Sequence, residues 1–398
     1  MNARPPVAVT AARLAAELAH LGPELGLDLV GAAALPAVLP HGARYTRWLE
    51  DERHGGLDYL ARDPAGRLDP TRTNPWATSL LVCGQRYTDG WPADDADPTA
   101  TGLAAPDAPW TARVARYARG RDYHDVLLKA MKRLVARLQE TWPDLVAYPA
   151  TDTGPYLERE WAWLAGLGFL GRNTCLIHEG LGSGLFLGVA PTNLVVQGLP
   201  PPGMPATAPL YGAAPRSEHP QGPAPATRCG TCTACLDACP TAALDLGGGL
   251  DARRCLSTWT IEWQGRAPAE RRTDQGGILF GCDICQAVCP WNMRAAARAQ
   301  AGQAPHRGDA YAADPAHREL ELADLIALSD EEFRARFRRT PLWRAHPGGL
   351  RRNALVVAAN AGRGDLEAAA ARAVGDPDQE TAAVARWAYA RLREGDPP

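Results

Sequence analysis

The strongest constraint on the fold of this chain is a pair of cysteine motifs. The segment CGTCTACLDACP, Cys229–Pro240, separates four cysteines by two, two and three residues and ends in proline. A second segment, CDICQAVCP, Cys282–Pro290, repeats the last three of these cysteines. Eight of the ten cysteines of the chain lie between Cys229 and Cys289. In a chain of 398 residues, such C-x-x-C clusters indicate metal binding more often than disulfide bonds.

The spacing of these cysteines fits iron-sulfur clusters. A C-x2-C-x2-C run supplies three thiolates from one loop, and in two-cluster ferredoxins the cysteine before the terminal proline binds the other cluster. By this rule, one cluster takes Cys229, Cys232, Cys235 and Cys289. The second cluster then lacks one thiolate, and Cys255, in DARRCLSTWT between the motifs, is the only cysteine left in this region. We therefore predict a second cluster bound by Cys239, Cys255, Cys282 and Cys285.

The cysteine pattern is also compatible with zinc. Zinc also accepts paired C-x-x-C motifs, but it does not require the Cys-Pro endings. Cys83 and Cys175 lie in or beside apolar runs, which is typical of core thiols. Two neighbouring clusters conduct electrons without consuming them. A catalytic site is therefore expected in the residues that precede Cys229.

The rest of the sequence predicts an α+β chain of several domains. Amphipathic segments at 11–21 and 125–142 and apolar runs at 79–84 and 184–190 predict an α/β catalytic domain over residues 1–196. Residues 88–109 are expected to form a surface loop, and residues 197–226, with nine prolines, an unpacked linker. A ferredoxin-like cluster domain is expected over 227–293. Residues 294–398 predict a helical domain with short Ala-rich helices of the HEAT-like kind.

Two polar segments upstream of the cysteines are candidates for catalysis. RYARGRDYHDVL brings Arg121, Asp122, Tyr123 and His124 together before a helix, and Asp122 fits the cap of that helix. ATDTGPYLERE offers Asp152 in a polar turn, a position that aspartate also takes for local reasons. The glycines of GLGFLGRN, 166–173, indicate a sharp turn or a close approach of the backbone. These residues alone do not choose between the two aspartates.

Charge restricts the partners of the chain. The formal net charge of −3 gives no general reason to expect nucleic acid. However, seven arginines lie between Arg334 and Arg352 with no acidic residue among them, and such a run suits phosphate binding, although charge runs are usually solvated surface. The N-terminal segment lacks the pattern of a secretory signal, and no run of about 18 apolar residues occurs. We therefore expect a cytoplasmic protein without a membrane span.

Five motifs taken together resemble the epoxyqueuosine reductases. In chain order they are RYARGRDYH, TDTGPYLEREWAWLAGLGFLGRN, CGTCTACLDACPTAAL, DARRCLSTWTIE and GCDICQAVCPWN. The resemblance extends from about residue 10 into the C-terminal helices. It implies that the chain reduces epoxyqueuosine to queuosine at the wobble position of tRNA, using cobalamin and two 4Fe-4S clusters. The segment 197–226 departs from the family, because it is longer than the usual link into the first cluster motif.

The resemblance also implies roles for individual residues. Asp152 would be the proton donor and a cobalamin contact, and further contacts would come from Arg67 in GRLDP and from main chain near Leu176 and Leu187. Removing the epoxide oxygen as water takes two electrons and two protons, so the leaving oxygen needs an acid. Asp152 is thus expected to have a raised pKa beside an apolar corrin face. Asp122 would remain a cap or positioning residue, and an external low-potential donor would supply the electrons.

The partner implied by the resemblance is tRNA with epoxyqueuosine in its anticodon loop. A monomeric enzyme would bind it through Arg338, Arg339, Arg351 and Arg352 and take up an extruded base. Two other functions stay open. A reductive dehalogenase would share the cobalamin and cluster core, but the basic C-terminal helices and the lack of a twin-arginine export signal argue against it. A non-catalytic electron carrier with a nucleic-acid tether would contain no cobalt.

Overall fold

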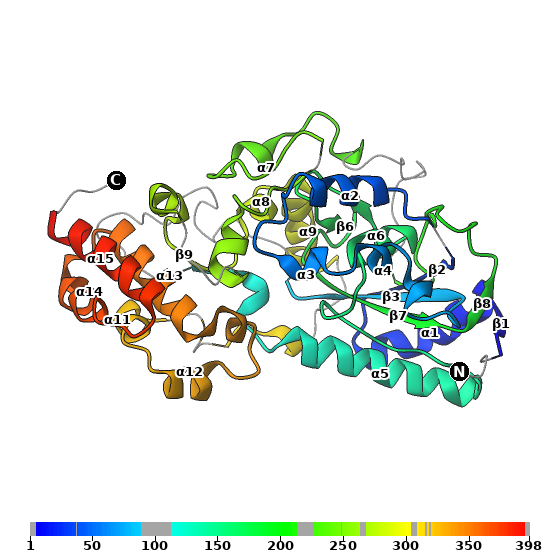
Figure 1. Cartoon of the computed structure of the whole chain (residues 1–398). Helices are drawn as coiled ribbons and strands as arrows, with labels where there is room; N and C mark the ends of the chain where they lie inside the picture. Colours follow the sequence, from blue (N-terminus) through cyan, green and yellow to red (C-terminus); the bar gives the residue numbers. More distant parts are fainter. Residues whose placement is uncertain are drawn as a thin grey trace.

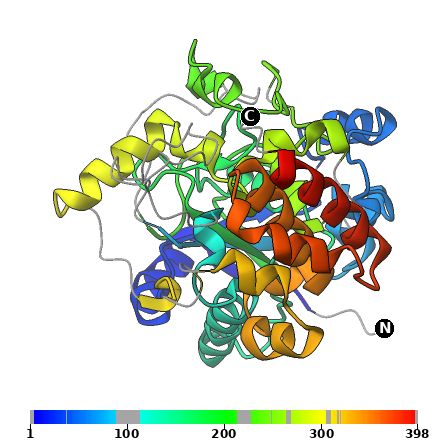
Figure 2. The ribbon, with the colours of Figure 1, turned by 90° about the vertical axis from the view of Figure 1, so that its left-hand side faces the viewer.

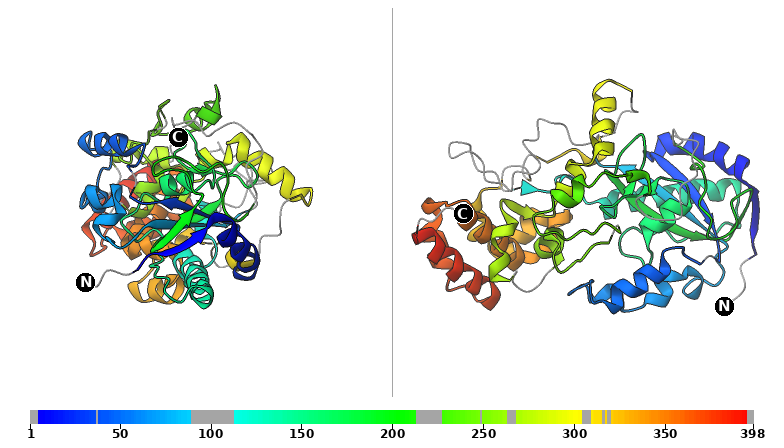
Figure 3. Two further views of the ribbon diagram at one scale, coloured as in Figure 1. Left: turned by 90° about the vertical axis from the view of Figure 1, so that its right-hand side faces the viewer. Right: turned by 90° about the horizontal axis from the view of Figure 1, so that it is seen from above.

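The chain forms an elongated molecule in which three regions follow one another (Figure 1). The computed structural model describes residues 5–36, 38–88, 113–212, 227–247, 249–262, 268–303, 309–314, 317 and 320–394. A sheet domain that holds the N-terminus lies at one end and the C-terminal helices lie at the other, as the view from above shows (Figure 3). The expected surface loop at 88–109 lies almost wholly outside the described residues.

An antiparallel sheet in the order β2-β3-β7 forms the centre of the first domain. Strand β3 (Ser79–Arg86) pairs with β2 (Leu29–Ala34) on one side and with β7 (Leu185–Thr192) on the other. A parallel pair, β1 (Val7–Thr10) with β8 (Leu194–Gln197), lies beside this sheet. Every residue of β3 is buried, which explains why its sequence reads as a continuous apolar run rather than an alternating one.

Helices cover both faces of this sheet. Helices α1 (Ala11–Leu25) and α5 (Tyr123–Thr141) pack on one face, and α6 (Glu158–Leu164) packs on the other. Successive strand residues point to opposite faces, so Leu81 contacts the first core and Leu80 the second. Helix α5 starts at Asp122, whose side chain accepts a hydrogen bond from the His124 N–H at 2.9 Å. The predicted cap is therefore confirmed.

Three short helices form an outer wall next to the sheet domain. They are α2 (Gly42–Glu50), α3 (Asp58–Ala61) and α4 (Pro64–Leu68). Trp48 on α2 donates its indole N–H to the Leu250 carbonyl at 2.5 Å, and Arg53 forms an ion pair with Asp245 at 3.0 Å. This wall is thereby tied to the cysteine-bearing region.

The cysteine-bearing region contains little regular structure. Each motif encloses one short helix, α7 (Ala234–Asp237) or α8 (Ile284–Ala287), and these two helices contact each other. A π-helical turn at Thr258–Glu262 follows Cys255. Strand β9 (Ile278–Phe280) pairs in parallel with β4 (Arg113–Val114), and helix α9 (Pro290–Gln300) begins at the proline of the second motif. Because α9 continues past residue 293, no break in the chain marks the predicted domain boundary there.

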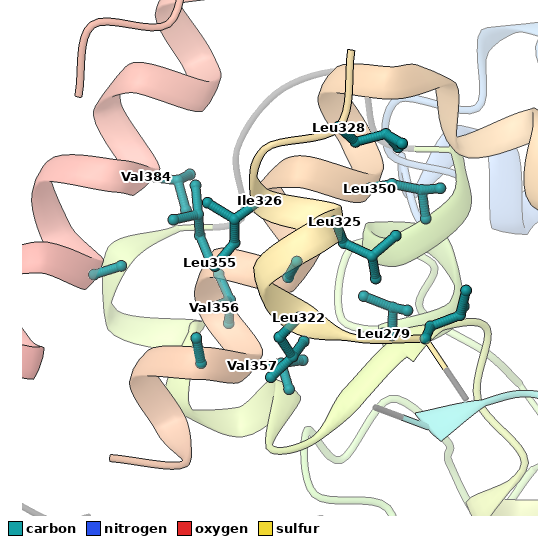
Figure 4. Packing of buried hydrophobic residues seen from close by; sticks show 14 of the residues in the cluster. Leu279, Leu322, Leu325, Ile326, Leu328, Leu350, Leu355, Val356, Val357 and Val384 are labelled. Atoms are coloured by element: carbon teal, nitrogen blue, oxygen red, sulfur yellow. The ribbon is translucent and has the colours of Figure 1, made fainter. Parts of the chain in front are cut away.

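The C-terminal region is helical. Its elements are α11 (Leu322–Ile326), α12 (Asp330–Phe337), a 3-10 helix at Pro341–Ala345, α13 (His346–Asn360), α14 (Glu367–Ala373) and α15 (Gln379–Glu394). Figure 2 shows α14 and α15 on the outer end of the molecule. Helix α13 lies at the centre, where Leu350, Leu355 and Val357 meet residues of α11 and of β9 (Figure 4). The HEAT-like character of these helices stays a prediction.

Helix α13 is fastened to the cysteine-bearing region by two buried asparagines. Asn353 donates from its amide nitrogen to the carbonyls of Thr260 and Leu279, at 2.9 and 2.8 Å. Asn360 donates to the carbonyls of Arg272 and Gly276, at 2.9 and 3.1 Å. The Thr260 carbonyl lies in the turn that follows Cys255, and the other three lie in the segment that precedes Cys282.

The proline-rich segment differs from the expected unpacked linker in its first part. Tyr211 forms an antiparallel bridge with Val30 of β2, and Leu199 and Leu210 pack against the core that holds α1 and α5. The reason is that β2 is an edge strand of its sheet, so its unpaired backbone groups are available to this segment at Tyr211. Residues 213–226 lie outside the described residues.

Candidate active site and cluster-binding cysteines

Four cysteines from the two motifs surround one cavity. The cavity has a volume of about 180 Å³, and its walls include Cys229, Cys232, Cys235 and Cys289. The first three come from the loop around α7, whereas Cys289 comes from the end of the second motif. This is the grouping that the Cys-Pro rule predicts. Arg172, Arg228, Arg294 and Trp291 complete the walls.

The other four cysteines of the region are electrostatic neighbours of one another. Burial raises the pKa of Cys282, and Cys255 and Cys239 add to that effect. Burial also raises the pKa of Cys285, and Cys175, Cys282, Cys255 and Cys235 contribute further, so Cys285 also interacts with one cysteine of the first group. Thiols so buried and so close together form thiolates only beside strong positive charge, which suits iron ligands.

Within the described ranges, no three His, Cys, Asp or Glu side chains converge closely enough to hold one ion. All ten cysteines are free thiols. A four-iron cluster instead needs four thiolates arranged around a larger body, as the cysteines of the first cavity are.

The motif GLGFLGRN anchors both cysteine loops, a role that its sequence did not reveal. Arg172 donates to the carbonyls of Cys232 and Gly230, the latter at 2.8 Å, and Asn173 donates to the Cys285 carbonyl at 3.4 Å. Gly166 has φ of +78°, and a Cβ there would lie 2.5 Å from the Ala208 carbonyl oxygen. The predicted turn and close backbone approach are therefore confirmed. The Arg-Asn pair after the glycines was the available signal for the anchor.

A larger cavity of about 490 Å³ lies between the outer wall, the turn at Asp152 and the segment that carries Cys255. Arg67, Asp152 and Cys255 all line it. The cavity thus brings together a predicted cobalamin contact, the predicted proton donor and a predicted cluster ligand. Aromatic and apolar side chains make up much of the remaining wall: Tyr45, Trp48, Leu57, Tyr59, Leu60, Tyr156, Leu157, Leu170 and Ile261.

Asp152 receives contacts from three side chains. Tyr123 donates its hydroxyl to Asp152 Oδ2 at 2.7 Å, and His124 Nε2 lies 3.5 Å from the same oxygen. Arg344, from the 3-10 helix before α13, forms an ion pair with it. His124 is itself held by Asp122, whose Oδ1 lies 2.7 Å from Nδ1. Asp152 has φ of +56°, a left-handed conformation that costs a non-glycine residue free energy and needs surrounding contacts to persist.

These contacts fix the charge of the site. Burial favours the neutral form of Asp152, but the His124 hydrogen bond, the Arg344 charge and the Tyr123 hydrogen bond outweigh it, and the pKa lies well below its ordinary value. Burial opposes a charged His124, yet Asp122 and Asp152 raise its pKa to about 9. The expectation of a raised pKa for Asp152 is therefore wrong for this arrangement. The proton shared by the pair resides on His124.

Glu158 is a second proton-carrying group beside Asp152. Its Oε1 accepts a hydrogen bond from the Asp152 backbone N–H at 2.7 Å. Burial, and then the charge of Asp152, raise the pKa of Glu158 to about 8. The sequence contains this residue in TDTGPYLERE, but no pattern there distinguishes it from the neighbouring Glu160.

Several predicted residues lie outside the larger cavity. Leu176 is buried in the short strand pair β5 (Phe169–Leu170) and β6 (Leu176–Ile177), and the Leu187 carbonyl accepts the Thr151 hydroxyl at 2.7 Å. Neither is among the residues that line the cavity. Cys83 is buried in β3, as expected of a core thiol. Cys175 is only half-buried, and it lies near Cys285 rather than in a purely apolar core.

The arginine run divides into two groups. Arg338 and Arg339 are exposed at the end of α12, although Arg339 also pairs with Asp125 at 2.9 Å. Arg351 instead forms an ion pair with Asp376 at 3.0 Å, and Arg352 pairs with Asp378 at 2.7 Å. The side chains of Arg351 and Arg352 are only 12% and 11% exposed. This corrects the expectation that these two bind RNA, because their guanidinium groups join α13 to the loop before α15.

None of the helices in the described ranges combines the length and apolar character that crossing a bilayer requires.

The fold and the site define an iron-sulfur oxidoreductase. The family model of the 4Fe-4S double cluster binding domain matches residues 228–292, which contain all eight cysteines of the two groups. A second model, described as Epoxyqueuosine reductase QueG, DUF1730, matches residues 67–153, a range that begins at Arg67 and includes Asp152. The chain belongs to the epoxyqueuosine reductase family, whose members are oxidoreductases that act on tRNA.

Relatives extend over most of the chain. The epoxyqueuosine reductase of Pseudomonas aeruginosa is 38% identical over 350 residues, which cover 88% of this chain and 86% of that protein. The enzyme of Gloeobacter violaceus is 36% identical, over 85% of this chain and 94% of that protein.

Solved structures agree with this assignment. A crystal structure of an epoxyqueuosine reductase with an epoxyqueuosine-modified tRNA-Tyr stem loop has a TM-score of 0.77 and 26% identity, covering 96% of this chain and 91% of that one. The Bacillus subtilis enzyme, solved with its catalytic aspartate loop swung out of the active site, has a TM-score of 0.74 and 26% identity over the same shares.

Proposed function

We propose that this chain reduces epoxyqueuosine to queuosine at the wobble position of tRNA, with cobalamin and two 4Fe-4S clusters as cofactors and Asp152 as proton donor. The observation that carries the proposal is the larger cavity, which Asp152 and Cys255 line together. An acid and a cluster ligand on one cavity are what a reduction coupled to proton transfer requires.

The cluster ligands are proposed from the two groups of cysteines. One cluster would be bound by Cys229, Cys232, Cys235 and Cys289, and the other by Cys239, Cys255, Cys282 and Cys285. The cavity lined by the first group supports this division, as do the effects of Cys255 and Cys239 on the pKa of Cys282. Electrons from an external low-potential donor would enter at the first cluster, because only the second has a ligand, Cys255, on the larger cavity.

The larger cavity is also the proposed cobalamin site. Its aromatic and apolar walls suit the face of a corrin, and Arg67, fixed by its hydrogen bond to the Tyr59 carbonyl at 3.0 Å, offers a cation for polar substituents. Leu176 pairs with the lining residue Leu170, and the Leu187 carbonyl bonds Thr151 beside Asp152, so main chain near both stays a proposed cobalamin contact. When bound there, cobalamin would supply the reducing centre that acts on the epoxide carbon.

The proton that the leaving oxygen needs is carried by residues of this chain. His124 holds it in the described arrangement, because its pKa is about 9. Asp152 lies between His124 and the cavity, so it would take the proton from His124 and deliver it to the oxygen. Asp122 keeps the imidazole oriented through the bond to Nδ1. The swung-out aspartate loop of the Bacillus subtilis relative supports a catalytic role for this turn.

The tRNA would bind across the C-terminal helices. Arg338 and Arg339 are exposed at the end of α12, and Arg344, six residues beyond Arg338, reaches Asp152. A phosphate backbone bound along this surface would place an extruded anticodon base at the larger cavity. The relative solved with a modified tRNA stem loop supports tRNA as the substrate.

Two measurements test the proposal together. Anaerobically purified, cobalamin-supplemented protein should contain about eight iron and about one cobalt per chain, and it should convert epoxyqueuosine tRNA with a strong chemical reductant. Asp152→Asn should lower turnover by about 100-fold or more while the iron content stays unchanged. Asp365→Asn, which removes a carboxylate of the C-terminal helices far from the cavity, is the matched control. Full turnover by Asp152→Asn would remove that residue from its proposed role.

A further inference from the structure

Arg344 joins three regions of the molecule at the candidate active site. One guanidinium nitrogen contacts Asp152, on the turn that lines the larger cavity. The other lies 2.7 Å from Glu262 Oε1, at the end of the π-helical turn that follows Cys255. Arg344 itself belongs to the 3-10 helix at Pro341–Ala345 in the C-terminal region. The residue therefore links the catalytic turn, the cluster region and the proposed tRNA-binding helices.

This link conflicts with the chemistry expected of Asp152. A carboxylate that faces His124 and Arg344 accepts hydrogen bonds and has no proton to give. Other ionisable groups near it, namely Tyr123, Glu158, Tyr59, Tyr117 and Glu262, do not reverse this state, because the pKa of Asp152 stays lowered in their presence. One cation must therefore leave Asp152 before Asp152 can carry a proton to the cavity.

The two cations differ in how firmly they are placed. His124 lies in the first turn of the 19-residue helix α5, and Asp122 holds its other ring nitrogen. Arg344 comes from a five-residue 3-10 helix that follows the exposed Arg338 and Arg339, and the residue before it in this helix, Trp343, is 38% exposed. Arg344 is also the more exposed of the two, since 34% of its side chain is accessible against 24% for His124, so it is the cation that a nucleic-acid phosphate reaches more readily.

We propose that Arg344 is a positioning residue that holds Asp152 in the tRNA-free enzyme, and that tRNA bound on the C-terminal helices withdraws it from Asp152. This inference rests on the proposed function. A phosphate offers the guanidinium a two-oxygen partner of the same kind as the carboxylate it leaves. The acid would then become available only when the substrate is in place.

A double-mutant cycle on tRNA affinity tests the proposal without any turnover. If Asp152 competes with RNA for Arg344, Asp152→Asn should tighten binding of an unmodified tRNA-Tyr anticodon stem loop by about two- to fivefold, as a partly exposed ion pair allows. In the Arg344→Gln background the same change should have no effect, because the competition has been removed. Arg344→Lys, which keeps the charge, should restore part of the effect.

Controls separate this mechanism from simpler ones. Arg363→Gln breaks a comparable exposed pair with Asp365 and should leave RNA affinity unchanged. The iron content of each variant shows that it has folded. Equal tightening by Asp152→Asn in both backgrounds would indicate general repulsion of RNA and overturn the proposal, as would no tightening in either.

The outcome is distinguishable from a failure of the proposed function. A wild-type protein that binds the stem loop but converts no epoxyqueuosine would refute the function, and the cycle would still decide the role of Arg344. A protein that converts epoxyqueuosine but shows additive effects of the two substitutions would refute only the role of Arg344.

Discussion

Replacing Cys255 with alanine gives the most direct test of the site. The residue lies outside both cysteine motifs, and the backbone N–H groups of Thr258 and Ser257 bond its sulfur. Its loss would leave three thiolates, Cys239, Cys282 and Cys285, for the proposed second cluster, which needs four. Two four-iron clusters hold about eight iron per chain, so Cys255→Ala should retain about four. Turnover of epoxyqueuosine tRNA should fall below detection, because electrons would no longer reach the larger cavity.

Elemental analysis and electron paramagnetic resonance of the reduced protein measure this effect. The first cluster should keep its signal, while the signal of the second disappears. Cys83→Ala is the matched control: it also removes a buried sulfur, but from β3, and it should keep about eight iron. Cys175 needs a separate test because it lies near Cys285. Eight iron in Cys255→Ala, together with a loss of iron in Cys175→Ala, would refute the ligand assignment.

Three further predictions concern charge and packing. The pKa of His124 rises from 6.5 to about 9 on folding, so its ion pairs stabilise the protein fully below pH 6.5 and lose that effect as pH rises through about 9. His124→Gln should therefore reduce the fall in Tm between pH 6 and pH 9.5. An unchanged fall would contradict the pKa assigned to His124. Arg338→Gln should weaken tRNA binding and lower the salt dependence of the affinity by about one charge. Arg352→Gln should instead lower Tm and leave the salt dependence of the affinity unchanged. Binding titrations at several salt concentrations measure the difference. Asn353→Leu leaves two buried carbonyls without a donor and should cost about 1–3 kcal/mol of stability in urea unfolding of the anaerobic protein; a loss near zero would mean that water replaces the amide.

The sequence was most informative where chemistry fixes both the residue type and its spacing. Counting thiolates leads to a definite prediction for both clusters, with Cys255 as the fourth ligand of the second, because a four-iron cluster needs four thiolates. Local rules succeeded for Asp122, since an N-cap depends only on the residues of the first helical turn. The strand at 79–84 and the helix at 125–142 were predictable for the same reason: burial imposes a pattern on neighbouring residues.

The sequence failed where long-range contacts decide. The pKa of Asp152 depends on His124 and on Arg344, which are 28 and 192 residues away in the chain, and no local pattern joins them. Arg338 and Arg352 look alike in an acid-free run, but the carboxylate that pairs with Arg352 belongs to Asp378, beyond the run. Whether an arginine faces RNA or a neighbouring helix therefore follows from the packing of α13 and α15.

The amide of Asn353 has a consequence for the order in which the enzyme is made. It bonds the carbonyl of Thr260, close after Cys255, and that of Leu279, just before Cys282. The two segments that contain the proposed ligands of the second cluster are thus held in register by a helix that the ribosome produces some seventy residues later. Iron delivered to the nascent chain would find the first loop, around α7, complete in sequence long before the frame of the second site exists. We therefore expect stable loading of both clusters to follow release of the finished chain, and chains truncated before α13 to retain iron poorly.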